Sequence, residues 1–442
     1  MRLSFGLFAL AGTVSAASAQ VVNGIRSAPA QTPITATRSV AQATDSLRLS
    51  RRQAIAEALT RNAQLEIARE QTAQARARRV TAIAIPDPTL TAAYDQEAAP
   101  FGFGGAASKP VAVGLTVPFP DKFRLNNRIG LADIGASESN YRLQQQTVAL
   151  QASASYDSLL VALMHRGNLR EARDLAADFL KRTQARYDAG SAPRLDVIQA
   201  QVGVAQADND LIANERDIAN AQASLNRTLG RVIGAPVAPT DSLDMPAPLP
   251  DSASIDQTAL ANRPELAILR NQQSGARAST SLIKEFWLPD LTFAVTRDYI
   301  APGSPQFTTG IALPLPAFYW QHSRGDIAQA QHFERELDAT YRDTRAQVTQ
   351  DVRSAYANAS TAMRQVAFIR DVLVPAARES YRVSSTSYSL GGSSALEVLT
   401  ARSALLQAEA QLADALAAAN TARADLDRAL GLALPTLGAS NR

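Results

Sequence analysis

The chain has 442 residues, 46% of them hydrophobic and 19% charged, so it is long enough for about three domains and apolar enough to bury large cores. Lys and Arg total 44 against 41 Asp and Glu, a near balance that argues against a polybasic nucleic-acid binder and an acidic disordered tail. The absence of cysteine excludes disulfide scaffolds, thiolate zinc sites, iron–sulfur clusters and cysteine nucleophiles.

Residues 1–19 are predicted to be a signal peptide. Arg2 supplies a positive charge, residues 3–14 form an apolar stretch, and residues 17–19 are the small residues of a cleavage site. Residues 20–45 are expected to form a flexible N-terminal segment. After the signal peptide the sequence has no window of about 18 uninterrupted apolar residues. These features indicate a protein that a bacterium exports.

The remainder of the chain contains two copies of one unit. Tyr187-Asp-Ala-Gly190 aligns with Tyr388-Ser-Leu-Gly391 at a shift of 201 residues, and over the 44 positions that begin there 14 are identical. The landmarks predict a first repeat over 46–234, a proline-rich linker over 235–252, a second repeat over 253–431 and a tail over 432–442. Each repeat is expected to contain helix, strand, loop, strand, long helix, turn and long helix.

The predicted long helices exceed the dimensions of a compact domain. Residues 122–186 contain no proline, and residues 322–387 contain only Pro375. About 65 helical residues extend about 100 Å. After both turns apolar residues recur every seven positions, as in Val398, Leu405 and Leu412, with a second row rich in alanine. This seam favours a rod or tube of packed helices; the alternative is an ordinary helical bundle core.

Two predicted strand hairpins, at 87–118 and 289–316, have a period of two. Val111, Val113 and Leu115 alternate with small residues, and Leu291 and Phe293 do the same in the second repeat. One face is therefore apolar, and the other is small and polar. In a soluble sheet the apolar face would pack on a helix, whereas in a membrane it would contact lipid. Four strands cannot close a barrel, and the sequence leaves open whether two or three chains join.

The full order of elements resembles the TolC family of outer-membrane efflux channels. The sharpest match runs from Tyr388 to Arg402 (YSLGGSSALEVLTAR), and the subclass is similar to CzcC-type heavy-metal efflux subunits. The resemblance implies a mostly α fold with β, a duplicated long-helix coiled-coil tunnel whose four strands per chain contribute to a shared transmembrane β-barrel. It implies a homotrimer in the outer membrane of a Gram-negative bacterium, in contact with lipid and extending into the periplasm.

The resemblance further implies a passive exit duct of a tripartite pump, with metal cations as cargo. Its partners would be a periplasmic adaptor (membrane fusion) protein and an inner-membrane pump of the RND type or another type. No nucleic acid, cofactor or catalysis is expected.

The resemblance also implies functional residues at the two helical turns. In the family these tips form the periplasmic mouth, which an acidic ring with tyrosine and arginine links holds closed. Glu397 and Asp196 match the acidic positions, and Tyr388 matches the tyrosine. The tight turns, where an adaptor would dock, contain Gly190, Gly391 and Gly392.

This sequence departs from the family pattern at two positions. Thr400 stands where a second acid is expected, and Ser393 stands where the linking arginine is expected. The missing acid implies a weaker acidic ring, and the missing arginine implies different gating bonds. Ser394 and Glu397 also have the spacing of a capping box, so Glu397 has a structural alternative, and Asp196 suits the first turn of a helix.

Two other classes of function remain open from the sequence. One is an exported coiled-coil structural or adhesive protein without a pore, and the other is a soluble periplasmic enzyme or binding protein. His322 and His332 are ten residues apart and His165 is isolated, so the histidines predict no metal site. The alternation in the strands distinguishes the channel from both alternatives.

Overall fold

The computed structural model describes residues 47–93, 110–298, 306–313 and 319–432. The predicted signal peptide (1–19), the predicted flexible segment (20–45) and all but the first residue of the predicted tail (432–442) lie outside the described residues. Parts of the hairpins predicted at 87–118 and 289–316 lie outside them as well.

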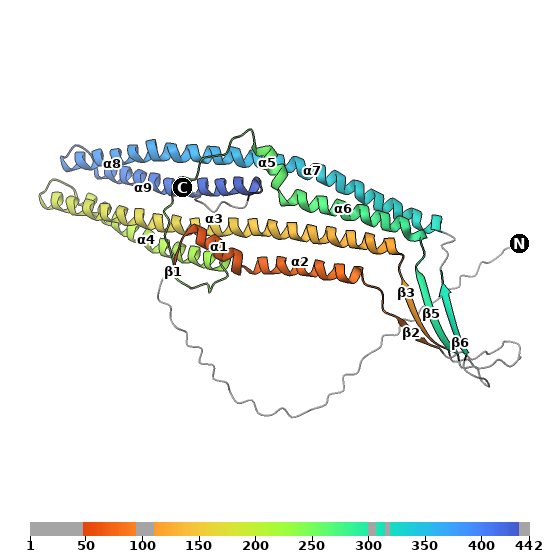
Figure 1. Ribbon diagram of the computed structural model, residues 1–442. Coiled ribbons are helices and arrows are strands. Elements are labelled where there is room, and N and C mark those ends of the chain that lie inside the picture. Colours follow the sequence, from red (N-terminus) through yellow and green to blue (C-terminus); the bar gives the residue numbers. More distant parts are fainter. Residues whose placement is uncertain (1–46, 94–109, 299–305, 314–318, 433–442) are drawn as a thin grey trace, which may run out of the picture. The chain divides into compact units, whose positions relative to one another are not determined.

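Both halves of the chain run strand, two helices, two strands and long helices (Figure 1). The second half differs by a 3-10 segment before its last two strands and by a π-helical segment that divides its first long helix. The first half contains β1 (Leu47–Leu49), α1 (Arg51–Arg61), α2 (Ala63–Ala82), β2 (Thr89–Ala92), β3 (Val111–Val117), α3 (Pro120–Asp188) and α4 (Arg194–Thr228). The second half contains β4 (Val237–Pro239), α5 (Ile255–Asn262), α6 (Pro264–Lys284), η1 (Glu285–Trp287), β5 (Leu291–Asp298), β6 (Gln306–Ala312), α7 (Tyr319–Phe368), η2 (Ile369–Leu373), α8 (Val374–Ser389) and α9 (Ala395–Ala429).

Each half has two helices before its antiparallel strands, where the sequence predicted one. The break after α1 lies at Asn62, whose ψ of 126° is extended and whose side chain accepts a hydrogen bond from the Gln64 amide, so it caps α2. The break after α5 lies at Arg263, whose ψ is 123°, because Pro264 follows it and disfavours helical backbone in the preceding residue.

The long helices pack side by side. Helix α3 has 69 residues, which corresponds to about 100 Å. It contacts α2, α4, α6 and α9, while α9 also contacts α7 and α8 (Figure 1). The predicted heptad rows are largely buried, with Val398, Leu405 and Leu426 on one row of α9 and Ala401 and Ala408 on the other. None of the helices in the described ranges is both long and apolar enough to cross a bilayer.

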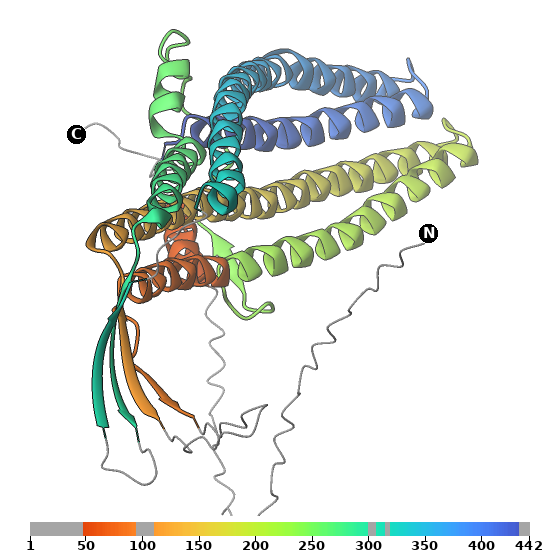
Figure 2. The same ribbon diagram turned by 90° about the vertical axis from the view of Figure 1, so that its right-hand side faces the viewer.

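Strands β2, β3, β5 and β6 form one antiparallel sheet in that order. The central pair joins the two halves, because Leu115 on β3 lies opposite Phe293 on β5. Across β5 and β6, Phe293 lies opposite Ile311. In Figure 2 the four strands extend together from the ends of the helices. The register therefore gathers apolar residues of both halves on one face.

On β5 the apolar face of the sheet is the more exposed one. Leu291, Phe293 and Val295 on β5 are between 38% and 48% exposed, whereas the intervening Thr292 and Ala294 are half-buried. The opposite face consists of small and polar residues, and the hydroxyls of Thr292 and Thr116 lie 3.0 Å apart on it. A sheet that packed on its own helices would bury the apolar face instead.

Candidate functional site at the helical tips

The turns that join α3 to α4 and α8 to α9 have the same backbone geometry. Gly190 and Gly391 have φ values of +73° and +85°, a left-handed conformation that other residues adopt only with strain. In the first turn the Ser191 amide donates to the Arg186 carbonyl (2.8 Å), and in the second the Gly392 amide donates to the Ser387 carbonyl (2.8 Å). These bonds satisfy the last carbonyls of α3 and α8, as in a Schellman motif.

Tyr388 lies where the hairpin of α3 and α4 packs against the hairpin of α8 and α9, a contact that we call the joint. Its side chain is 3% exposed, its ring centroid is 5.2 Å from that of Phe179 on α3, and Ala395 and Val398 of α9 belong to the same cluster. Its hydroxyl donates to a carboxylate oxygen of Asp196 on α4 at 3.2 Å. Burial raises the pKa of Tyr388, and the Asp196 charge adds to the effect. The hydroxyl therefore remains a hydrogen-bond donor at neutral pH.

Glu397 makes different contacts. It is exposed, its carboxylate accepts a hydrogen bond from the Ser394 amide (3.4 Å), and the Ser394 hydroxyl accepts one from the Glu397 amide (3.3 Å). The capping box expected from the sequence is thus present at the start of α9. The structure brings Tyr388 and Asp196 together, and it places Glu397 on its own helix terminus.

The two positions that depart from the family pattern bond locally. The Ser393 hydroxyl donates to the Ser384 carbonyl (3.0 Å), within the same hairpin. The Thr400 hydroxyl donates to the Leu396 carbonyl (2.8 Å) one turn earlier in α9. Both of these bonds stay within the second hairpin.

Sequence reasoning did not identify Arg186, which lies near the end of α3 and reaches the second hairpin. Its guanidinium donates to the main-chain carbonyl of Tyr388 and lies 4.5 Å from the centroid of the Tyr388 ring. The position aligned with Arg186 in the second repeat is Ser387. This difference between the two copies could have drawn attention to Arg186. It does not reveal which residue the arginine contacts.

The joint is not duplicated even though the sequence is. Tyr187 aligns with Tyr388, yet Tyr187 is 38% exposed while Tyr388 is buried. Asp196 aligns with Glu397, but Asp196 accepts a hydrogen bond from a tyrosine, whereas Glu397 accepts one from the Ser394 amide. The two hairpins of the chain are therefore joined by one of the two tyrosines.

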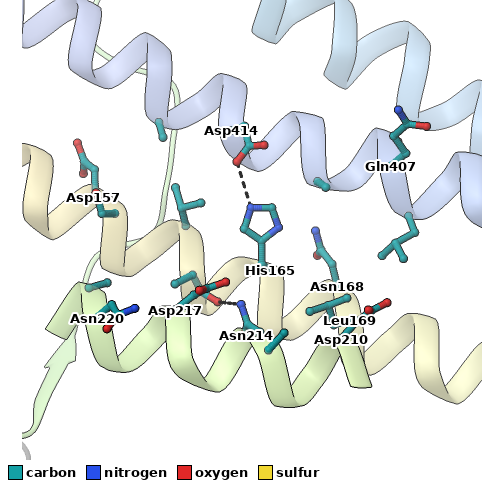
Figure 3. Close-up of a pocket in the computed structure, with 18 of the residues that line it drawn as sticks. Asp157, His165, Asn168, Leu169, Asp210, Asn214, Asp217, Asn220, Gln407 and Asp414 are labelled. Atoms are coloured by element: carbon teal, nitrogen blue, oxygen red, sulfur yellow. Dashed lines mark hydrogen bonds and ion pairs between the residues drawn. The ribbon is translucent and has the colours of Figure 1, made fainter. Parts of the chain in front are cut away.

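A groove of about 1060 Å³ lies farther along the helices, where α3, α4 and α9 meet (Figure 3). The His165 Nε2 atom lies 3.1 Å from a carboxylate oxygen of Asp414, a contact between the two halves of the chain. The described part of the chain holds no group of three or more His, Cys, Asp or Glu residues that could bind a metal ion. Four aspartates and no lysine or arginine line the groove: Asp157, Asp210, Asp217 and Asp414.

The comparison with protein-family models matches residues 54–231 and 256–432 to the family described as outer membrane efflux protein. The chain belongs to this family. It is accordingly an outer-membrane channel that extends into the periplasm, and its role is passive rather than enzymatic. The family match extends over both halves of the chain.

Individual relatives agree with the family. The cobalt-zinc-cadmium resistance protein CzcC of Cupriavidus metallidurans is 24% identical over 309 residues, which cover 68% of this chain and 73% of CzcC. The outer membrane protein TolC of Escherichia coli is 22% identical over 307 residues, which cover 64% of this chain and 60% of TolC. The resemblance to the TolC family and to its CzcC-type members is confirmed.

A solved structure of CusC matches the fold with a TM-score of 0.74 at 17% identity, and the match covers 88% of this chain and 93% of the CusC chain. The predicted fold class, long duplicated helices with four strands per chain, is confirmed.

Proposed function

We propose that the chain is the outer-membrane exit duct of a tripartite efflux pump and carries its cargo passively across the periplasm and the outer membrane. The observation that carries the proposal is the sheet, whose exposed apolar face alternates with a small polar face, at one end of helices about 100 Å long. An apolar outer surface suits lipid, and a small polar surface suits a water-filled interior. A coiled-coil protein without a pore gives no reason for this alternation.

The duct is proposed to be a homotrimer. In the described part of one chain the outer strands β2 and β6 each pair on one side only, and exposed edges of this kind favour pairing with another chain. An apolar stripe on α4 also lacks cover, because Leu195, Ile198, Val202 and Ile212 are between 46% and 68% exposed. A single amphipathic face of this kind is typical of a helix that packs against another chain. Three copies would supply twelve strands to one closed wall.

The tips are proposed to form the gate. Tyr388 and Asp196 would hold the two hairpins of each chain together, and Glu397 would add a carboxylate to the ring at the mouth. Carboxylates that converge on a narrow axis repel one another and attract cations. The exposure of Glu397 supports this role, which is compatible with its capping box.

The partners are proposed to be a periplasmic adaptor and an inner-membrane pump, of the RND type or another type, with outer-membrane lipid around the strands. The adaptor would dock at the turns formed by Gly190, Gly391 and Gly392. Apolar side chains next to these turns support a docking role, since Leu195, Leu390 and Leu396 are between 60% and 83% exposed.

Metal cations are the proposed cargo. The support is the name of the relative CzcC, a cobalt-zinc-cadmium resistance protein. A deletion strain tested with cobalt, zinc and cadmium salts and with a panel of antibiotics examines this point. Sensitivity to the metals alone, restored by a plasmid copy, is expected; sensitivity to the antibiotics alone would refute metal cargo.

The gate is tested in planar bilayers. Glu397→Ala should lower the ratio of cation to anion permeability of the reconstituted channel. Glu409→Ala on the same helix is the matched control, because Glu409 pairs with Arg378 about three helical turns away from the mouth. If Glu397→Ala leaves the ratio of cation to anion permeability unchanged, Glu397 acts only as a helix cap.

A further inference from the structure

Arg186 makes a set of contacts between the two hairpins that suits the planar guanidinium. One nitrogen donates to the Tyr388 carbonyl, and another donates to the Ser191 carbonyl at 3.1 Å. The Cζ atom of the same group lies over the Tyr388 ring, 4.5 Å from its centroid. A lysine ammonium has three donors but no rigid planar fork, so it cannot hold two carbonyls at fixed positions and also lay a flat face on a ring. We call these three contacts the tip clamp.

The tip clamp joins elements that are far apart in the sequence. Arg186 is near the end of α3, Ser191 lies in the turn after it, and Tyr388 is near the end of α8. The contact therefore fixes the first turn and the second hairpin in one place. Tyr388 in turn bonds to Asp196, so the clamp and the tyrosine hydroxyl bond act on the same residue from two sides.

Other arginines near the tips do not duplicate these contacts. Arg182 forms an ion pair with Asp178 on its own helix, and it donates a long bond of 3.5 Å to the Ser385 hydroxyl of the second hairpin. Arg402 on α9 donates to the Gly203 carbonyl at 3.4 Å, farther from the turns. In the described residues, Arg186 is thus the arginine that stacks on the ring at the joint.

The helix that the clamp holds has a weak point at its other end. Helix α7 continues into α8 through a π-helical segment, η2 (Ile369–Leu373), and Pro375 follows at the start of α8. π-Bulges and prolines are the usual sites at which helices bend. Helix α8 can therefore swing about this segment once its far end is released from Arg186.

We propose that Arg186 is a positioning residue of the gate, which holds Tyr388 and the end of α8 against the first hairpin and so keeps the mouth closed within each chain. The proposal rests on the gating role proposed for the tips. Arg186 acts through the position of Tyr388, and it need not contact the permeating cation. Release of the clamp opens the mouth and leaves the carboxylates of the mouth in place.

The decisive variant is Arg186→Lys, because it keeps the charge and the aliphatic stem and loses the planar fork of donors and the flat face of the guanidinium. The ratio of released to docked tips is expected to rise about tenfold in each chain. In a trimer whose three tips release independently, complete opening in planar bilayers would become about a thousandfold more frequent. Arg194→Gln is the matched control, since Arg194 is an exposed cation at the start of α4. Its occupancy should equal that of the wild type. An open-state occupancy of Arg186→Lys equal to that of the wild type would overturn the proposal.

Hydrogen exchange of the purified full chain separates this proposal from the gating role itself. Peptides covering residues 384–394 should exchange faster in Arg186→Lys than in the wild type, whereas peptides from the middle of α3 should not change. If the wild type forms no channel in bilayers, the gating role fails, and the exchange result still decides whether Arg186 holds the joint. Equal exchange in both proteins would refute the clamp.

Discussion

The hydroxyl of Tyr388 offers a sharp test of the joint, because Tyr388→Phe removes one oxygen and keeps the ring. The phenyl ring still fills the cluster and keeps its tilted contact with Phe179, with the ring centroids 5.2 Å apart. The loss is the hydrogen bond to the half-buried Asp196 carboxylate at 3.2 Å. Hydrogen bonds to charged groups contribute about 1.5–3 kcal/mol, and the length and partial exposure of this one favour the lower value.

The loss of about 1.5 kcal/mol changes the ratio of docked to released tips by about tenfold in each chain. In a trimer whose three joints release independently, the complete opening would become about a thousandfold more frequent. Single-channel recording in planar bilayers measures this directly as open-state occupancy. Cells that carry the variant should also become more sensitive to large antibiotics that the closed channel excludes.

The first repeat supplies the matched control. Tyr187→Phe removes the same oxygen at the aligned position, where the ring is 38% exposed and lies outside the joint. Its open-state occupancy should stay within about twofold of the wild type, as expected for a surface substitution. The account of the joint would be refuted if Tyr388→Phe had the same open-state occupancy as the wild type. It would also be refuted if the two phenylalanine variants had equal occupancies.

Three further predictions concern the sheet, a buried acid and a turn. Phe293→Arg should reduce the trimer assembled in outer membranes, because an arginine facing mid-bilayer costs about 2–4 kcal/mol, whereas Thr296→Arg on the opposite face should assemble normally; equal yields would contradict the assigned faces. Burial raises the pKa of Asp427 above its unfolded value, so its contribution to the free energy of unfolding falls as pH rises from about 4 through the raised pKa. The melting temperature of the wild type relative to Asp427→Asn should therefore drop between pH 4 and pH 7, and a constant difference would refute the argument. Gly391→Ala should destabilise the tip by about 1–2 kcal/mol because φ is +85°, while Gly167→Ala, with open space around it inside α3, should be neutral or stabilising in thermal melts.

Much of the fold follows from periodicity in the sequence. The period of two in β5 and the period of seven in α9 are properties of each segment by itself, so both are visible without the structure. The pairing of β3 with β5 is also consistent with the duplication, since it places equivalent apolar faces side by side. The breaks at Asn62 and Arg263 had local signals, a capping side chain and a following proline, which the long apolar pattern obscured.

The tip joint was only partly accessible from the sequence. Tyr388, Asp196 and Glu397 were selected through the family resemblance, and the capping box was visible in the spacing of Ser394 and Glu397. The sequence did not predict that Tyr388 is buried while Tyr187 is exposed, because the difference depends on how two hairpins about 200 residues apart lie against each other. Arg186 was missed for the same reason.

The most direct test of the channel assignment is the environment of the two faces of β5 in the assembled protein. Because the chain contains no cysteine, a nitroxide label can be placed at Phe293 or at the adjacent Ala294 through a single introduced cysteine. Electron paramagnetic resonance in lipid vesicles then compares collisions with oxygen, which concentrates in lipid, and with a nickel chelate, which stays in water. The account predicts an oxygen-accessible label at 293 and a chelate-accessible label at 294. Two labels with the same accessibility, or with the reverse order, would contradict a lipid-facing apolar surface and the duct built on it.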